Sequence, residues 1–171
     1  MSRVFFAADL HYGHKNIHKY RPQFTSELEH RDYVTHQWNK TVTTRDKVYV
    51  LGDVCFTMEA IESIAELNGN KVLVRGNHDN LNTSEYLKVF SQVEGVARYK
   101  GFWLTHVPIH PLELRGANNI HGHVHGATIP DIRYENVSME NIDYTPIEWS
   151  VLIEKRTAKA ELFYGRTQCK T

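Results

Sequence analysis

The tetrapeptide Gly76-Asn77-His78-Asp79 places an amide, an imidazole and a carboxylate side by side, directly after the apolar run 71–75. Such a set can supply a metal ligand, a proton donor and a group that orients the donor. An Asx-type turn with a surface histidine would explain the tetrapeptide equally well. The choice depends on whether other strands end in residues of the same kinds.

Two further pairs have a spacing suited to metal binding. Asp9 and His11 follow the apolar run 3–8, and His123 and His125 follow Asn119-Ile120. In extended backbone, residues two apart point to the same side, so each pair can converge on one ion. A solvated loop would also explain either pair alone.

Single polar residues end two more apolar runs. Asp53 follows 47–51 after Gly52, and His106 follows 102–105. The chain also holds 11 histidines, where typical usage gives about four, and five of them lie between His106 and His125. In a chain without net charge, a cluster of histidines indicates metal binding more than it indicates a charged surface.

The runs that carry these residues alternate with helical segments. Strands are expected at 3–8, 47–51 and 71–75, with helices at 27–42 and 58–67 between them. Val34, Trp38 and Val42 recur every four residues and form the expected buried stripe of the first helix, whereas His30 and His36 are expected to be exposed on it. The order predicts a βαβ core whose strand ends meet at one edge.

The second half has a weaker pattern. A short helix is expected at 85–90, a hairpin from 96–99 and 102–105, and a strand at 132–138. Thr145-Pro146-Ile147-Glu148 has the spacing of a helix N-terminus, which predicts a helix from there to about residue 155. An edge strand is expected at 158–164.

Composition limits the class of protein. With 171 residues, 41% of them hydrophobic, the chain is expected to form one domain, residues 1–171, of the α/β class. The 20 basic and 20 acidic residues cancel, so no overall field favours nucleic acid or a membrane. No membrane span or signal segment is expected, and two cysteines, Cys55 and Cys169, without C-x-x-C spacing fit a reducing cytoplasm.

Taken together, these motifs resemble the calcineurin-like metallophosphoesterase family. Asp9-x-His11, Gly52-Asp53, Gly76 to Asp79, His106 and Gly122-His123-x-His125 stand in family order. Further details, such as Trp38-Asn39, are similar to small single-domain bacterial and phage members. The resemblance implies a four-layer αββα sandwich of two mixed sheets.

The resemblance also implies roles for individual residues. One metal ion would be held by Asp9, His11 and His125, with Asp53 bridging to the second. His78 would be the general acid, Asp79 would orient it, and His14 is placed near the phosphate. The second ion would be held by Asn77, His106 and His123.

The chemistry expected from such a centre is hydrolysis of a phosphodiester or a small phosphorylated metabolite. A hydroxide bridging two divalent ions would attack in line, and His78 would protonate the leaving oxygen. Nitrogen and oxygen ligands without thiolate make Mn the first choice, with Fe, Zn, Ni or Co as alternatives.

Two alternatives remain open at this point. A nuclease of the same family is disfavoured by the neutral charge, although nucleic acid is not excluded as a partner. A catalytically silent, protein-binding scaffold would be expected to have lost ligands, and here each is present. The sequence indicates neither the natural substrate nor the oligomeric state.

Overall fold

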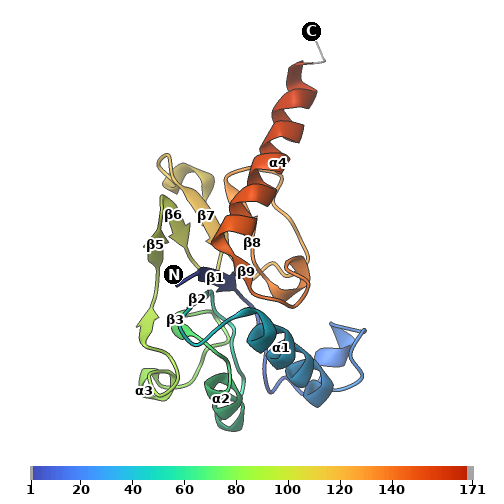
Figure 1. The fold of residues 1–171 in the computed structure, drawn as a ribbon, viewed down its shortest axis with the longest axis vertical. Helices are drawn as coiled ribbons and strands as arrows, with labels where there is room; N and C mark the ends of the chain where they lie inside the picture. The colour runs from blue at the N-terminus through green and yellow to red at the C-terminus, as the bar shows by residue number, and fades with distance from the viewer. Residues whose placement is uncertain (1, 169–171) are drawn as a thin grey trace.

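Two mixed β-sheets face each other in the computed structural model, which describes residues 2–168, and helices cover their outer sides (Figure 1). This is the α/β, four-layer arrangement that the resemblance implied. Cys169 lies outside the described residues. No helix within residues 2–168 combines the length and apolar character that crossing a membrane requires.

The first sheet has the strand order β4-β3-β2-β1-β9. Strands β1 to β4 run parallel, and β9 runs antiparallel to β1. Parallel strands bring their carboxyl ends to one edge, where sites in α/β proteins are built. The strands are β1 (Val4–Ala7), β2 (Lys47–Val50), β3 (Asn70–Val74), β4 (Gln92–Glu94) and β9 (Ile147–Glu148).

The second sheet has the order β5-β6-β7-β8. Strands β5 and β6 form the expected antiparallel hairpin, with Lys100 and Gly101 in the turn at positive φ. Strand β7 pairs in parallel with both β6 and β8. The strands are β5 (Ala97–Tyr99), β6 (Phe102–Leu104), β7 (Asn118–His121) and β8 (Tyr134–Asn136).

Local capping residues begin the first two helices. The hydroxyls of Ser26 and Thr57 accept hydrogen bonds from backbone N–H groups three residues on, as N-caps do. The stripe of Val34, Trp38 and Val42 is buried, as predicted. The helices are α1 (Glu27–Thr41), α2 (Met58–Ala65), α3 (Thr83–Tyr86) and α4 (Trp149–Gln168), with short 3₁₀ turns η1 (Ile17–Lys19), η2 (Pro111–Glu113) and η3 (Met139–Asn141).

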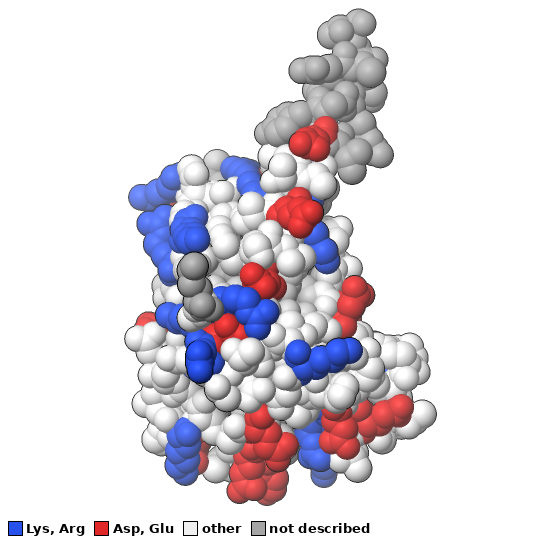
Figure 2. All heavy atoms as spheres, viewed as in Figure 1, with Lys and Arg blue, Asp and Glu red and all other residues white. Residues whose placement is uncertain are grey.

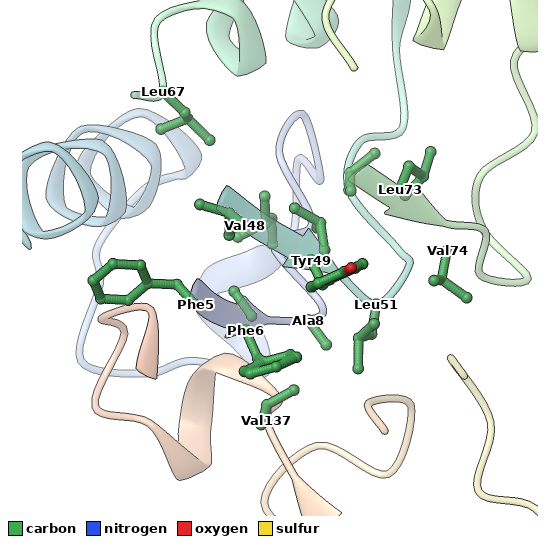
Figure 3. Packing of buried hydrophobic residues seen from close by; sticks show 14 of the residues in the cluster. Phe5, Phe6, Ala8, Val48, Tyr49, Leu51, Leu67, Leu73, Val74 and Val137 are labelled. Atoms are coloured by element: carbon green, nitrogen blue, oxygen red, sulfur yellow. The ribbon is translucent and has the colours of Figure 1, made fainter. Parts of the chain in front are cut away.

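Aromatic side chains join the two sheets. The rings of Phe6 on β1 and Tyr49 on β2 stack with centroids 5.7 Å apart, and Tyr99 of β5 approaches Phe6 at 5.8 Å. Figure 3 shows Phe6 and Tyr49 side by side among aliphatic residues, with Val137 next to Phe6. Because both sheets contribute to one core, their edges are held in a fixed relation.

The carboxyl-terminal segment differs from its prediction. Ile147 and Glu148 form β9 beside β1 instead of starting a helix, and α4 begins at Trp149. The unpaired edge of β1 explains this, because tertiary pairing outweighs a capping pattern. The predicted edge strand 158–164 is also wrong: this stretch continues α4, and its first part, Ala158-Lys-Ala-Glu-Leu162, is made of helix-forming residues.

The prediction that His30 is exposed is wrong as well. His30 on α1 is fully buried, whereas His36 on the same helix is exposed, as expected. The rings of Phe24 and Tyr12 surround His30 at 5.0 and 6.2 Å. These neighbours come from the loop before α1 and the segment after β1, so the spacing along α1 could not identify them.

Candidate metal centre

The predicted metal ligands come together where strands of both sheets end. The segment after β1 runs beside the segment after β2: the N–H of Asp9 donates to Gly52 O and that of His11 to Asp53 O, each at 3.0 Å. The chain after β7 returns to the same place, because the N–H of His123 donates to the Asp9 carboxylate at 3.0 Å. The site is therefore assembled from both sheets.

Backbone strain is concentrated at these residues. A side chain in the left-handed region costs of order 1–3 kcal/mol, and such residues cluster at functional sites. Five of the seven predicted ligands have this conformation, so the chain at these residues departs from the extended backbone expected for the two ligand pairs. They are Asp9 (φ 60°), His11 (55°), Asp53 (55°), His123 (72°) and His125 (49°).

Glycines permit the close approach of these segments. A Cβ atom on Gly122 would lie 2.6 Å from Oδ2 of Asp9, and one on Gly52 would lie 2.6 Å from Nδ1 of His106. No side chain fits at either position without displacing one of the predicted ligands.

One group of candidate ligands consists of Asp9, His11 and His125, whose ligand atoms lie within 4.8 Å of one another. His11 is buried, and neither of its ring nitrogens has a hydrogen-bond partner among the described residues. Burial lowers the pKa of His11 to about 2, so its imidazole is neutral. A neutral imidazole with a free nitrogen beside a buried carboxylate is what a divalent cation requires.

The second group surrounds His106. Its Nε2 lies 2.9 Å from Oδ1 of Asn77 and 3.1 Å from Nδ1 of His123. Its Nδ1 donates to the carbonyl of Leu51 at 2.8 Å, which leaves the lone pair on Nε2. The three predicted ligands of the second ion thus converge, and Asp9 and Asp53 also offer oxygens to His106 within 4.8 Å.

Asp53 lies between the two groups. Its Oδ1 is 3.4 Å from Nε2 of His106, and its Oδ2 is 3.9 Å from Nε2 of His11. Oδ1 also accepts a hydrogen bond from the backbone N–H of His78 at 2.9 Å. A carboxylate with one oxygen toward each group occupies the position that a bridging ligand needs.

Asp79 has different partners from those implied by the resemblance. Its two carboxylate oxygens accept hydrogen bonds from the backbone N–H groups of Asp53, Val54 and Gly76 at 2.8–2.9 Å. No hydrogen bond within residues 2–168 joins its carboxylate to the His78 ring. Asp79 therefore fastens the turn after β3 to the turn after β2, and the expected orienting role lacks a contact.

His78 and His14 lie at a pocket beside the first group. The pocket has a volume of about 670 Å³ and is also lined by Ile17, Tyr20 and Phe56. The Phe56 ring lies 5.1 Å from that of His78 and 4.9 Å from that of His14. The pocket therefore has imidazoles at the candidate metal centre and an apolar, aromatic wall beyond them.

Two charged residues at this pocket carry no signal in the sequence. Arg21 is 1% exposed, and its Nε donates to Glu140 at 2.9 Å. Burial would raise the pKa of Glu140, but the hydrogen bond from His125 and the charge of Arg21 outweigh it and lower that pKa to about 2. Neither residue belongs to a sequence motif. Their contact joins residues 119 positions apart, so no local spacing indicates it.

Cys55 does not join the site. It is buried two residues after Asp53, and burial raises the pKa of its thiol to about 12. A protonated thiol is a poor metal ligand. The available ligands are therefore imidazole, carboxylate and amide groups.

Comparison with known proteins identifies relatives over the same residues. Residues 2–165 match the family model described as calcineurin-like phosphoesterase. The uncharacterized protein MJ1445 of Methanocaldococcus jannaschii is 32% identical over 170 residues, which cover 90% of this chain and 91% of that protein. The gene 66 protein of Mycobacterium phage L5 is 30% identical over 114 residues, covering 58% of this chain and 55% of the phage protein.

A solved structure also has a similar fold. The crystal structure of AQ665, a protein of unknown function from Aquifex aeolicus, has a TM-score of 0.71 and 25% sequence identity to this chain. The match covers 94% of this chain and 100% of the other.

Proposed function

Because the chain belongs to the calcineurin-like phosphoesterase family, we propose that it is a metal-dependent hydrolase of phosphodiesters or small phosphorylated metabolites. The observation that carries the proposal is the convergence of candidate ligand groups from both sheets around Asp53, where neither ring nitrogen of His11 has a hydrogen-bond partner in the part of the chain that the structure describes. The scaffold alternative loses support, because every predicted ligand lies at the site.

The metal ions fit the donor atoms available. One ion would be held by Asp9, His11 and His125. The other would be held by Asn77, His106 and His123, and Asp53 would bind both ions. Two divalent ions so held would supply a nucleophile at neutral pH and neutralise phosphate oxygens. Mn is proposed first, since the donor set contains nitrogen and oxygen atoms and no thiolate.

His78 is proposed as the general acid. It is exposed at the pocket, and its backbone N–H is fixed by the Asp53 carboxylate at 2.9 Å. Its imidazole can therefore stay close to the candidate centre without serving as a ligand. A proton delivered from its ring to the leaving oxygen would complete the cleavage.

The pocket beyond His78 is proposed to hold the organic part of the substrate. Phe56 and Tyr20 present ring surfaces there, and His14 lies between them, with its ring 4.9 Å from Phe56 and 5.6 Å from Tyr20. Arg21 is already paired with Glu140, so it is not a free cation for a phosphate. His14 is the more accessible candidate for a phosphate contact.

Charge supports a small substrate over nucleic acid. The net charge is zero, and the face shown in Figure 2 carries Asp and Glu as well as Lys and Arg among the described residues. A nucleic-acid surface usually carries a continuous basic patch. A cytoplasmic location and a small phosphorylated partner remain predictions.

The test is hydrolysis of bis-p-nitrophenyl phosphate and p-nitrophenyl phosphate by metal-stripped protein, with Mn²⁺, Ni²⁺, Zn²⁺ or Mg²⁺ added back. We expect metal-dependent turnover, and the ratio of the two rates distinguishes diesterase from monoesterase activity. Two bound ions without turnover on either substrate would contradict the proposal and favour the scaffold.

A further inference from the structure

The carboxylate of Glu140 lies directly behind one candidate metal ligand. Its Oε1 is 3.2 Å from Nδ1 of His125 and 2.9 Å from Nε of Arg21. Glu140 belongs to η3, His125 follows β7, and Arg21 follows η1. Three segments far apart in the chain thus meet at one carboxylate oxygen.

We propose that Glu140 is a positioning residue for His125, and that Arg21 holds Glu140 in place for this purpose. With Nδ1–H donating to Glu140, the lone pair of the imidazole is on Nε2, the other ring nitrogen. A carboxylate behind a metal-binding histidine fixes its tautomer and orientation and makes it a stronger ligand. The inference rests on the metal centre of the proposed function.

The backbone of His125 is held from the same side. Its carbonyl accepts hydrogen bonds from the side-chain amides of Asn136, at 2.7 Å, and Asn141. Its φ of 49° is left-handed, so the residue depends on its surroundings to keep this conformation. Ring and backbone of His125 are therefore both fixed by residues around η3, although its side chain is 48% exposed.

Arg21 extends the support to the other side of the first group. Its Nη2 donates to the carbonyl of Asp9 at 2.7 Å, and its Nη1 donates to the carbonyl of Leu10 at 3.3 Å. One buried guanidinium thus contacts both the segment that carries Asp9 and His11 and the carboxylate behind His125. Arg21 and Glu140 carry opposite charges, so together they add no net charge to the site. The contribution of Glu140 is therefore to orient His125.

The second group has a separate support. His106 donates its Nδ1–H to the carbonyl of Leu51, and no contact of Glu140 within residues 2–168 reaches it. Loss of Glu140 should therefore lower the binding affinity of one metal ion and leave that of the other unchanged. This asymmetry distinguishes a positioning role from a general loss of stability.

The test is to titrate Mn²⁺ into metal-stripped wild type and metal-stripped Glu140→Gln. Calorimetry measures the affinity of each ion, and electron paramagnetic resonance reports whether the bound ions are coupled. We expect the affinity of one ion to fall about 10- to 100-fold in the variant. The other ion should keep its affinity, so the signal of a coupled Mn pair gives way to that of an isolated ion.

Glu135→Gln is the matched control. Glu135 is also partly buried and pairs with Arg156 at 3.2 Å and Lys159 at 3.8 Å, but it contacts none of the candidate ligands. We expect two ions to bind this variant as in wild type. An equal loss in both variants, or none in Glu140→Gln, would overturn the inference.

Two further outcomes are separable. A wild-type protein that binds no Mn²⁺ would refute the metal centre of the proposed function, and the inference with it. If circular dichroism shows Glu140→Gln unfolded, Glu140→Asp provides the test, because it keeps the charge opposite Arg21 while withdrawing the carboxylate from His125. The same selective loss of one ion is then expected, and unchanged binding of both would overturn the inference.

Discussion

We expect individual residues at this site to have separate roles, because some face the candidate ion positions and others do not. Asp53 directs one oxygen toward each ligand group, while His78 contacts Asp53 only through its backbone N–H. A change at His78 should therefore affect chemistry, and a change at Asp53 should affect metal content.

We expect His78→Ala to retain two metal ions and to lose about 10²- to 10⁴-fold in kcat, the usual contribution of a general acid. Asp53→Ala should lose both metal and activity. Elemental analysis and steady-state kinetics measure the two effects. Loss of metal from His78→Ala would show that the roles assigned here are wrong.

His30 should make stability depend on pH. Burial lowers its pKa to about 3, with Arg21 lowering it further and Glu140 opposing. Between pH 7.5 and 5 the unfolded chain binds a proton there and the folded chain does not, so stability falls with falling pH. One such group lowers the free energy of unfolding by about 2 kcal/mol between pH 7.5 and pH 5.

Urea unfolding at pH 7.5 and pH 5 measures this effect. In His30→Gln, whose amide can still accept from Arg21, the acid-induced loss of unfolding free energy should be about 2 kcal/mol smaller than in wild type. His36→Gln changes an exposed histidine on the same helix and should behave like wild type. An unchanged pH dependence in His30→Gln would refute the assignment.

At the scale of elements, the site depends on turns that are fastened to one another. The carboxylate of Asp79 joins the turn after β3 to the turn after β2 through three backbone N–H groups. The short loops can therefore keep the ligands in place although the strands themselves have ended.

We expect Asp79→Asn to lower the unfolding free energy by about 1–3 kcal/mol for each N–H left without an acceptor, since an amide has one acceptor oxygen where the carboxylate has two. Metal affinity should fall with it. Thermal unfolding and Mn²⁺ titration measure both, with the exposed Asp32→Asn as control. Unchanged stability together with a shifted pH profile of kcat would instead support an action of Asp79 on His78.

At the scale of the whole molecule, metal binding should stabilise the fold. Asp9, Asp53 and Asn77 follow strands of one sheet, and His106 and His123 follow strands of the other. Ions held between these ligands would therefore join the two sheets, in addition to the shared aromatic core.

Removing the metal should accordingly lower stability. At a metal concentration 100 times its dissociation constant, each ion contributes about 2.7 kcal/mol. Denaturation with Mn²⁺ and with chelator measures the difference, which Asp53→Ala should largely abolish. Equal midpoints in both conditions would contradict ion binding between the sheets.

The sequence by itself determined where the strands end and which candidate ligands follow them. Apolar runs followed by Asp, His or Asn are local patterns, and parallel strands must bring such ends to one edge. The motif order of the resemblance added the family, and the match over residues 2–165 confirmed it. These features were predictable because each is contained in a few consecutive residues or in their order.

Tertiary structure alone decided the supports of the site. Arg21, Glu140 and the buried His30 meet across segments 9 to 119 residues apart, and β9 formed because β1 had a free edge. The carboxylate of Asp79 likewise accepts hydrogen bonds from backbone N–H groups, including two on another turn, instead of contacting the histidine next to it in the sequence. Contacts between distant segments depend on how the sheets and loops pack, and no local spacing encodes that packing.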